Sequence, residues 1–122
     1  MSGMTRWESF RCALAGVVYV LRTQRNAHIE LIATAVVIAV GLWLQVTRLE
    51  WVLLAAMIGL VFTAEMINTA VECVVDLVTL EHLPLARIAK DVAAGGVLVT
   101  ILASCIVGLL IFGPRLWAMI GQ

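Results

Sequence analysis

Long uncharged stretches alternate with short polar clusters along this chain. Charged residues are absent from Leu31 to Thr47, from Trp51 to Ala64 and from Val92 to Pro114. A helix of roughly 17–25 mostly apolar residues is long enough to cross a bilayer. The pattern therefore predicts three membrane-spanning helices, at residues 27–47, 51–80 and 88–115. At 1.5 Å per residue, the second exceeds the hydrocarbon thickness of about 30 Å, so its last turns should project from the membrane.

The segment before the first span has a different pattern. Apolar residues at helical spacing, among them Trp7, Phe10 and Leu14, are interspersed with arginines. Residues 1–26 are therefore expected to form an amphipathic helix in the membrane interface. A surface helix packed on the bundle would show the same pattern. The expected fold class is all-α, a helical bundle with one domain over residues 1–122.

Composition and charge narrow the possible functions. Hydrophobic residues make up 63% of the chain, well above the roughly 45–50% of soluble domains. The eight basic and eight acidic residues give a formal net charge of zero, so no basic surface for nucleic acid is expected. The three cysteines have no metal-type spacing and are interpreted as small core residues.

The positions of the basic residues predict the topology. Four arginines precede the first span, and Arg87 and Lys90 lie between the second and third. Arg48 and Arg115 fall on the other side of the spans. Basic residues accumulate on the cytoplasmic side of membrane proteins. The N-terminus is therefore expected in the cytoplasm and the C-terminus outside.

An acidic stripe interrupts the second span. Glu65, Asn68, Glu72 and Asp76 fall within about 80° of one another at about 100° per residue, while the other faces of this helix are apolar. Three acids on one face are costly in lipid, so a cation, water or other protein groups must meet them.

The residues alone leave three interpretations of this stripe. Carboxylates near Lys90 and Arg87 suit Mg²⁺ and a nucleotide, and a carboxylate at the membrane surface could deprotonate a lipid hydroxyl. Glu65 could instead serve a proton or ion pathway. The third interpretation is a non-catalytic scaffold in which the acids pair with the two cations. The phosphate-binding loop GxxxxGK[ST] is absent from the sequence.

Two segments carry a family resemblance. Glu65–Asp76, with the spacing E-x-x-N-x-x-x-E-x-x-x-D, and Ala89–Leu98, with a Lys-Asp pair, resemble the signature of the prokaryotic diacylglycerol kinase family, which includes undecaprenol kinases. The similarity extends to the three-span layout and covers nearly the whole chain. It implies a homotrimeric enzyme of the bacterial inner membrane with active sites shared between subunits. Such an enzyme transfers the γ-phosphate of ATP, with Mg²⁺, to diacylglycerol or undecaprenol.

The resemblance also implies roles for individual residues. The catalytic base would be Glu65, with Asn68 orienting the site. The metal ligand would be Glu72. Further residues would contact ATP, namely Asp76, Glu81, His82, Lys90 and Asp91. The lipid substrate and the nucleotide would be contacted by Ser9, Ala13 and Gly16 of the amphipathic helix.

One position departs from the family pattern. The family often has a second metal-binding glutamate where this chain has Gln24. An amide oxygen can still ligate a metal or contact ATP, but it lacks the charge, so Glu30 or a water would have to substitute. The segments at residues 22–26 and 84–91 are more similar to the undecaprenol kinase branch than to the diacylglycerol branch.

Overall fold

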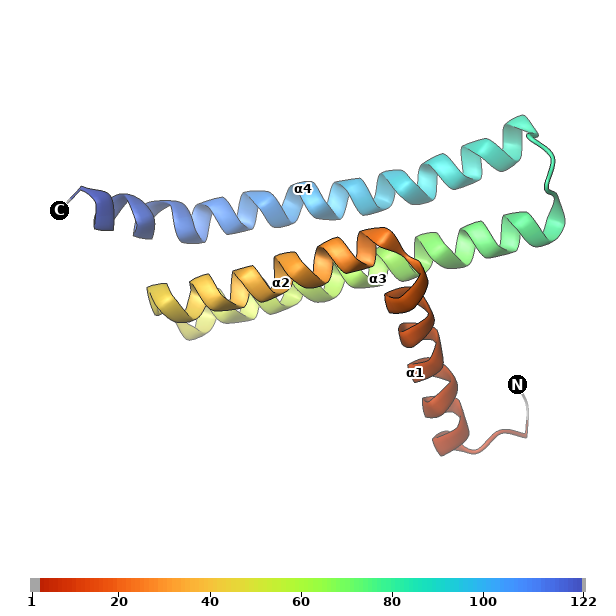
Figure 1. Cartoon of the computed structure of the whole chain (residues 1–122), viewed down its shortest axis with the longest axis horizontal. Coiled ribbons are helices and arrows are strands. Elements are labelled where there is room, and N and C mark those ends of the chain that lie inside the picture. The colour runs from red at the N-terminus through yellow and green to blue at the C-terminus, as the bar shows by residue number, and fades with distance from the viewer. Residues whose placement is uncertain (1–2, 122) are drawn as a thin grey trace.

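The computed structural model of the chain describes residues 3–121, which form four helices. They are α1 (Arg6–Thr23), α2 (Arg25–Leu44), α3 (Arg48–Val78) and α4 (Pro84–Ile120). Figure 1 shows α2, α3 and α4 running side by side, while α1 projects from them at a steep angle. The described residues contain no strand, and the all-α expectation is confirmed. Residues 1 and 2 of the expected amphipathic segment lie outside the described part.

Three of the helices are long and apolar enough to cross a membrane, namely α2, α3 and α4, which confirms the expected number of spanning helices. With 31 and 37 residues, α3 and α4 are about 46 and 55 Å long at 1.5 Å per residue. Both exceed the hydrocarbon core of about 30 Å. The hairpin that they form therefore extends beyond the lipid.

Two helices begin at a capping box. The Thr5 hydroxyl accepts a hydrogen bond from the Glu8 backbone N–H, and the Glu8 carboxylate accepts one from the Thr5 N–H. Thr47 and Glu50 form the same pair at the start of α3. Each box satisfies backbone donors that have no partner inside the helix. As a result α3 begins at Arg48, before the expected start at Trp51.

Both prolines of the chain lie in α4. Pro84 is the first residue of this helix, whereas α3 already ends at Val78. A proline fits this position because its missing N–H would have no helical partner there. Pro114, expected near the end of the third span, lies inside α4, which continues to Ile120.

The helices pack tightly at the end of the bundle opposite the α3–α4 connector. Val46, Leu54 and Ile111 form a small buried cluster there. A Cβ atom on Gly41 would lie only 2.6 Å from the Trp51 ring, so the glycine allows this ring to pack against α2. Most other large apolar side chains are exposed, which suits a surface covered by lipid or by other subunits. The three cysteines were expected in the core, and this expectation is wrong, because all three are exposed on this surface.

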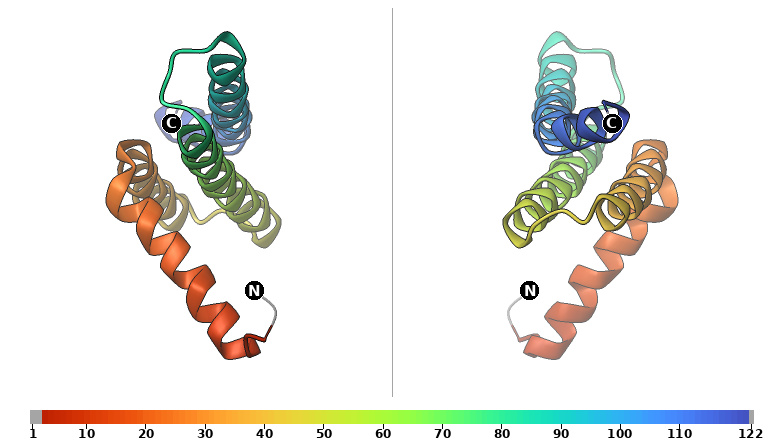
Figure 2. Two further views of the ribbon diagram at one scale, coloured as in Figure 1. Left: turned by 90° about the vertical axis from the view of Figure 1, so that its right-hand side faces the viewer. Right: turned by 90° about the vertical axis from the view of Figure 1, so that its left-hand side faces the viewer.

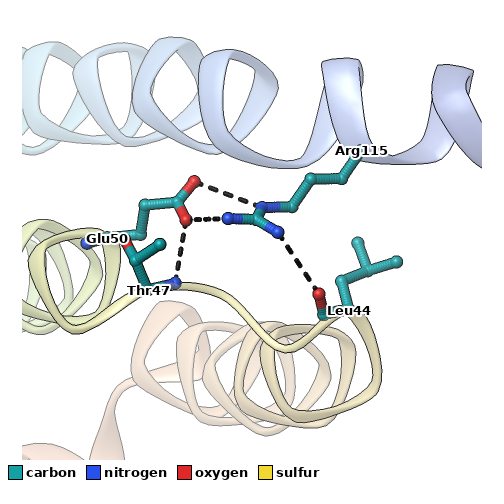
Figure 3. Close-up of polar contacts among 4 residues, drawn as sticks. All are labelled: Leu44, Thr47, Glu50 and Arg115. Carbon is teal, nitrogen blue, oxygen red and sulfur yellow. Dashed lines mark hydrogen bonds and ion pairs between the residues drawn. The ribbon is translucent and has the colours of Figure 1, made fainter.

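A polar cluster joins three helices at the same end (Figure 3). The Arg115 guanidinium of α4 forms a salt bridge with the Glu50 carboxylate of α3. Its Nη1 also donates to the Leu44 carbonyl at the end of α2, over 3.4 Å. Glu50 in turn accepts from the Thr47 N–H over 2.9 Å. The α2–α3 turn is thereby attached to α4.

Candidate functional site

The acidic stripe of α3 begins at a buried carboxylate. Glu65 is 1% exposed and Asn68 is 6% exposed, and Thr69 beside them is also buried. The Thr69 hydroxyl donates to the Glu65 backbone carbonyl over 2.9 Å, so it leaves the Glu65 side chain free for other partners. Spacings of three and four residues place these groups on one face of the helix.

A second buried carboxylate, Glu30, comes from α2 and is 8% exposed. It lies close enough to Glu65 for their charges to repel each other. The amides of Asn26 and Asn68 approach the Glu65 carboxylate. Because α2 already begins at Arg25, Asn26 and Glu30 lie one turn apart on one face of the helix.

Four oxygen atoms of this cluster have no hydrogen-bond donor among residues 3–121. They are both carboxylate oxygens of Glu30, Oε2 of Glu65 and Oδ1 of Asn68. Buried polar atoms in native proteins are nearly always satisfied, so such atoms indicate a missing donor or cation. The cluster is therefore suited to accept a hydroxyl proton or to face a cationic group.

The stripe continues toward the α3–α4 connector as an exposed charged network. Lys90 Nζ donates to Asp76 Oδ1 over 2.7 Å and so joins α4 to α3. Glu72 is half-buried and lies near enough to Glu65 and to Lys90 to interact with both electrostatically. Along α3 toward the connector, the site thus begins with the buried carboxylates Glu30 and Glu65 and ends with the exposed ion pair of Asp76 and Lys90. Asp91 is also exposed and lies 3.9 Å from the Arg87 guanidinium.

The other expected site residues lie apart from this stripe. Glu81 and His82 are exposed in the connector, and Ser9 and Ala13 are exposed on the projecting α1. Gly16 also lies on α1. Within residues 3–121 the structure records no side-chain hydrogen bond or ion pair between any of these residues and the stripe.

Gln24 lies at the joint between α1 and α2, where its Nε2 donates to the Thr23 hydroxyl over 3.1 Å. The joint is bridged by His28, whose Nε2 lies 2.6 Å from the Leu21 carbonyl oxygen. Sequence reasoning missed Asn26 as a neighbour of Glu65 and named Glu30 only as a substitute ligand. The signal that could have found them is their spacing of four residues on a helix that starts earlier than expected.

The described residues contain no group of three or more His, Cys, Asp or Glu side chains placed to hold a metal ion. Mg²⁺ commonly uses only one or two carboxylates, together with phosphate oxygens and water. The half-buried Glu72, between the buried carboxylates and Lys90, fits that requirement.

An apolar cavity of about 640 Å³ lies between α2, α3 and α4. Glu30 is the only charged residue among those that line it, and the remainder are mostly aliphatic or aromatic. The cavity therefore extends from Glu30, one member of the buried carboxylate pair, into the apolar part of the bundle.

Comparison with known proteins identifies the family. Residues 11–112 match the family described as "Prokaryotic diacylglycerol kinase". The chain belongs to this family. With its three apolar spanning helices, it is a membrane lipid kinase, and the family implies ATP as the phosphoryl donor.

The chain is similar both to an undecaprenol kinase and to diacylglycerol kinases. It is 43% identical over 110 residues to the undecaprenol kinase of Bacillus subtilis (strain 168), covering 90% of this chain and 89% of the relative. It is 42% identical over 112 residues to a diacylglycerol kinase of Synechocystis, covering 91% of this chain and 64% of the relative. The diacylglycerol kinase of Escherichia coli (strain K12) is 34% identical over 77 residues, 63% of each chain.

Proposed function

We propose that this kinase transfers the γ-phosphate of ATP to the hydroxyl of a membrane lipid alcohol, with Glu65 as the catalytic base. The observation that carries the proposal is the Glu65 side chain, which is 1% exposed and keeps Oε2 without a donor among residues 3–121. Its neighbours in the cluster are acceptors or amides. A lipid hydroxyl entering this cluster would supply the missing donor and would lie within reach of the base.

The reaction then follows from the positions of the groups. Glu65 takes the hydroxyl proton as the lipid oxygen attacks the γ-phosphorus of ATP. The bond from this phosphorus to the bridging oxygen breaks, ADP leaves, and the lipid becomes a phosphate monoester. The Asn68 amide, one turn away on the same face, orients the Glu65 carboxylate. Positioning and charge stabilisation provide most of the rate enhancement in phosphoryl transfer.

The donor side of the site is assigned to the charged network. Lys90 supplies positive charge for the phosphates, and Asp76 holds its ammonium group in place. Glu72 would hold Mg²⁺, which neutralises phosphate charge during transfer. Further nucleotide contacts are assigned to residues nearer the connector and the α1–α2 joint, namely Glu81, His82, Asp91 and Gln24.

The assembly proposed is a homotrimer with shared active sites, each chain being one kinase domain over residues 1–122. Ser9, Ala13 and Gly16 are assigned to lipid and nucleotide contact. Their place on the projecting α1 supports a role beside another subunit. The proposed location is the bacterial inner membrane, with the N-terminus and the α3–α4 connector in the cytoplasm, because six of the eight basic residues lie on that side.

The acceptor proposed is undecaprenol rather than diacylglycerol. The support is similarity: an undecaprenol kinase matches over nearly the full length of both chains. The diacylglycerol kinase of similar identity is longer, and the match spans 64% of it.

The test is transfer of label from γ-labelled ATP in mixed micelles with Mg²⁺, offering undecaprenol and diacylglycerol separately. The expected result is labelled undecaprenyl phosphate, with little or no labelled phosphatidate. Labelling of diacylglycerol alone would overturn the acceptor, and labelling of neither lipid by folded protein would overturn the proposed function. Proton flux in liposomes without ATP would instead favour a proton pathway, and absence of nucleotide binding would favour a scaffold.

A further inference from the structure

The cavity between α2, α3 and α4 is elongated along the helices. Its lining on α4 extends from Ile101 to Leu116, which is about 22 Å at 1.5 Å per residue. One end contains Glu30, and the other end reaches Leu116, next to the Arg115 salt bridge with Glu50. The cavity is therefore a groove along the bundle, with a carboxylate at one end and the polar cluster of Figure 3 at the other.

The length of this groove exceeds one leaflet. Half of a hydrocarbon core of about 30 Å is about 15 Å, whereas the groove extends for about 22 Å. An acyl chain of a diacylglycerol is confined to its own leaflet. A groove that passes the bilayer midplane suits a longer chain. The groove is lined by residues of all three long helices, which do not lie in one layer in the end-on views of Figure 2.

The groove also has room at its middle. A Cβ atom built on Gly108 or Gly113 would meet no atom within 4 Å, and both glycines line the groove. Thr34 and Ser104 contribute hydroxyls, but these already donate to the backbone carbonyls of Glu30 and Thr100. Because both hydroxyls are already hydrogen-bonded, the middle of the groove offers only apolar contacts. It therefore suits a hydrocarbon chain without polar groups.

At its charged end the groove meets the proposed catalytic cluster. Both oxygens of Glu30 lack a donor within residues 3–121, and the carboxylate lies near Glu65. An alcohol whose chain occupies the groove would place its hydroxyl at Glu30. A polyprenol has a single chain that ends in a hydroxyl, and the groove is a single channel that ends at a carboxylate. A diacylglycerol has two chains, of which the groove would hold one.

We propose that this groove binds the single hydrocarbon chain of a polyprenol across the bilayer midplane, and that Glu30 positions the hydroxyl for Glu65. The inference rests on the proposed function, because it assigns the acceptor's chain to a place in that site. Glu30 is a positioning residue in this account, and the chain length that the enzyme prefers is set by the groove.

The test is a series of polyprenols of increasing isoprene number, assayed with the full chain and with Gly108→Phe. The new ring would project into the middle of the groove, where a Cβ atom at this position meets no atom within 4 Å. Gly108 lies about 10 Å along α4 from Ile101 at 1.5 Å per residue. Short prenols should therefore keep their kcat/KM, while long prenols should lose roughly tenfold, the effect of a lost apolar contact of about 1.4 kcal/mol. Leu110→Phe, on the exposed side of α4, is the matched control and should leave the whole series unchanged.

Four outcomes are separable. Loss restricted to long prenols in Gly108→Phe supports the groove. An unchanged series in Gly108→Phe, with an active unsubstituted enzyme, overturns the groove and leaves the proposed function standing. Loss at every chain length together with loss of the oligomer on size exclusion also overturns it, because a second copy of the chain would then fill the groove. If the unsubstituted enzyme phosphorylates no lipid alcohol, the proposed function itself fails.

Discussion

At the residue scale, the unusual feature is a pair of buried carboxylates on neighbouring helices. Glu30 and Glu65 are 8% and 1% exposed and lie near each other. Burying two acids is costly unless a proton, donor or cation is brought to them. Three of their four carboxylate oxygens have no donor within residues 3–121, so a hydroxyl-bearing ligand would supply one.

Glu30→Gln tests the positioning role. A neutral amide keeps the shape but is a weaker acceptor for the lipid hydroxyl. The KM for the lipid alcohol should rise about tenfold, as expected for loss of a charged hydrogen bond worth about 1.5 kcal/mol. The KM for ATP should stay unchanged. A change in the KM for ATP with none for the lipid would place Glu30 on the nucleotide side instead.

Gln24→Glu tests the metal site by adding a carboxylate to it. A carboxylate at this position would add a charged oxygen where the family often has one, and Mg²⁺ prefers carboxylate ligands. The Mg²⁺ concentration for half-maximal activity should fall in a titration at fixed ATP. An unchanged titration curve would mean that residue 24 does not reach the metal, and that Glu72 acts with phosphate and water alone.

The acidic stripe could be predicted from sequence because helical periodicity depends only on spacing. Glu65, Asn68, Glu72 and Asp76 all lie on α3, and the structure shows the change from buried to exposed along them. The partnership of Glu30 with Glu65 could not be predicted in the same way. It joins two helices, and its geometry depends on how α2 packs against α3.

At the element scale, the polar cluster at the α2–α3 turn holds the long helices together. Arg115 bonds Glu50 and the Leu44 carbonyl, which lie 65 and 71 residues before it in the sequence. Arg115→Met should lower the melting temperature in detergent by several degrees, because Glu50 loses its partner and the turn is released from α4.

Arg48→Met is the control for that measurement, because Arg48 is exposed on the same turn. It should leave the melting temperature nearly unchanged. Equal shifts in the two variants would show that total charge at this end, rather than the salt bridge, determines the stability.

The presence of the spanning helices could be predicted from the length of the apolar stretches. The residues at which the helices begin and end could be predicted less well. The starts of α1 and α3 are determined by Thr-x-x-Glu capping boxes, a local signal that apolar stretches do not reveal. The continuation of α4 through Pro114 depends on tolerance of a proline inside a long apolar helix. Both are decided by backbone hydrogen bonding rather than by hydropathy.

At the scale of the whole molecule, a single chain leaves its site residues dispersed. Ser9 and Ala13 lie on the projecting α1, and most large apolar side chains are exposed. We expect a trimer when the protein is purified in mild detergent and measured by light scattering with correction for bound detergent. A fully active monomer would contradict this assembly. The sequence could not show which subunits meet, because contacts between copies leave no spacing pattern.

Proton removal from the lipid hydroxyl by Glu65 is tested by the Glu65→Gln variant. Transfer of label from γ-labelled ATP to lipid is measured, with folding, oligomer size and ATP binding checked in the same preparation. We expect kcat to fall by about 10²–10⁴-fold, the contribution of general base catalysis, with ATP binding retained. If a well-folded variant keeps its activity within about tenfold of the unsubstituted enzyme, Glu65 is not the base.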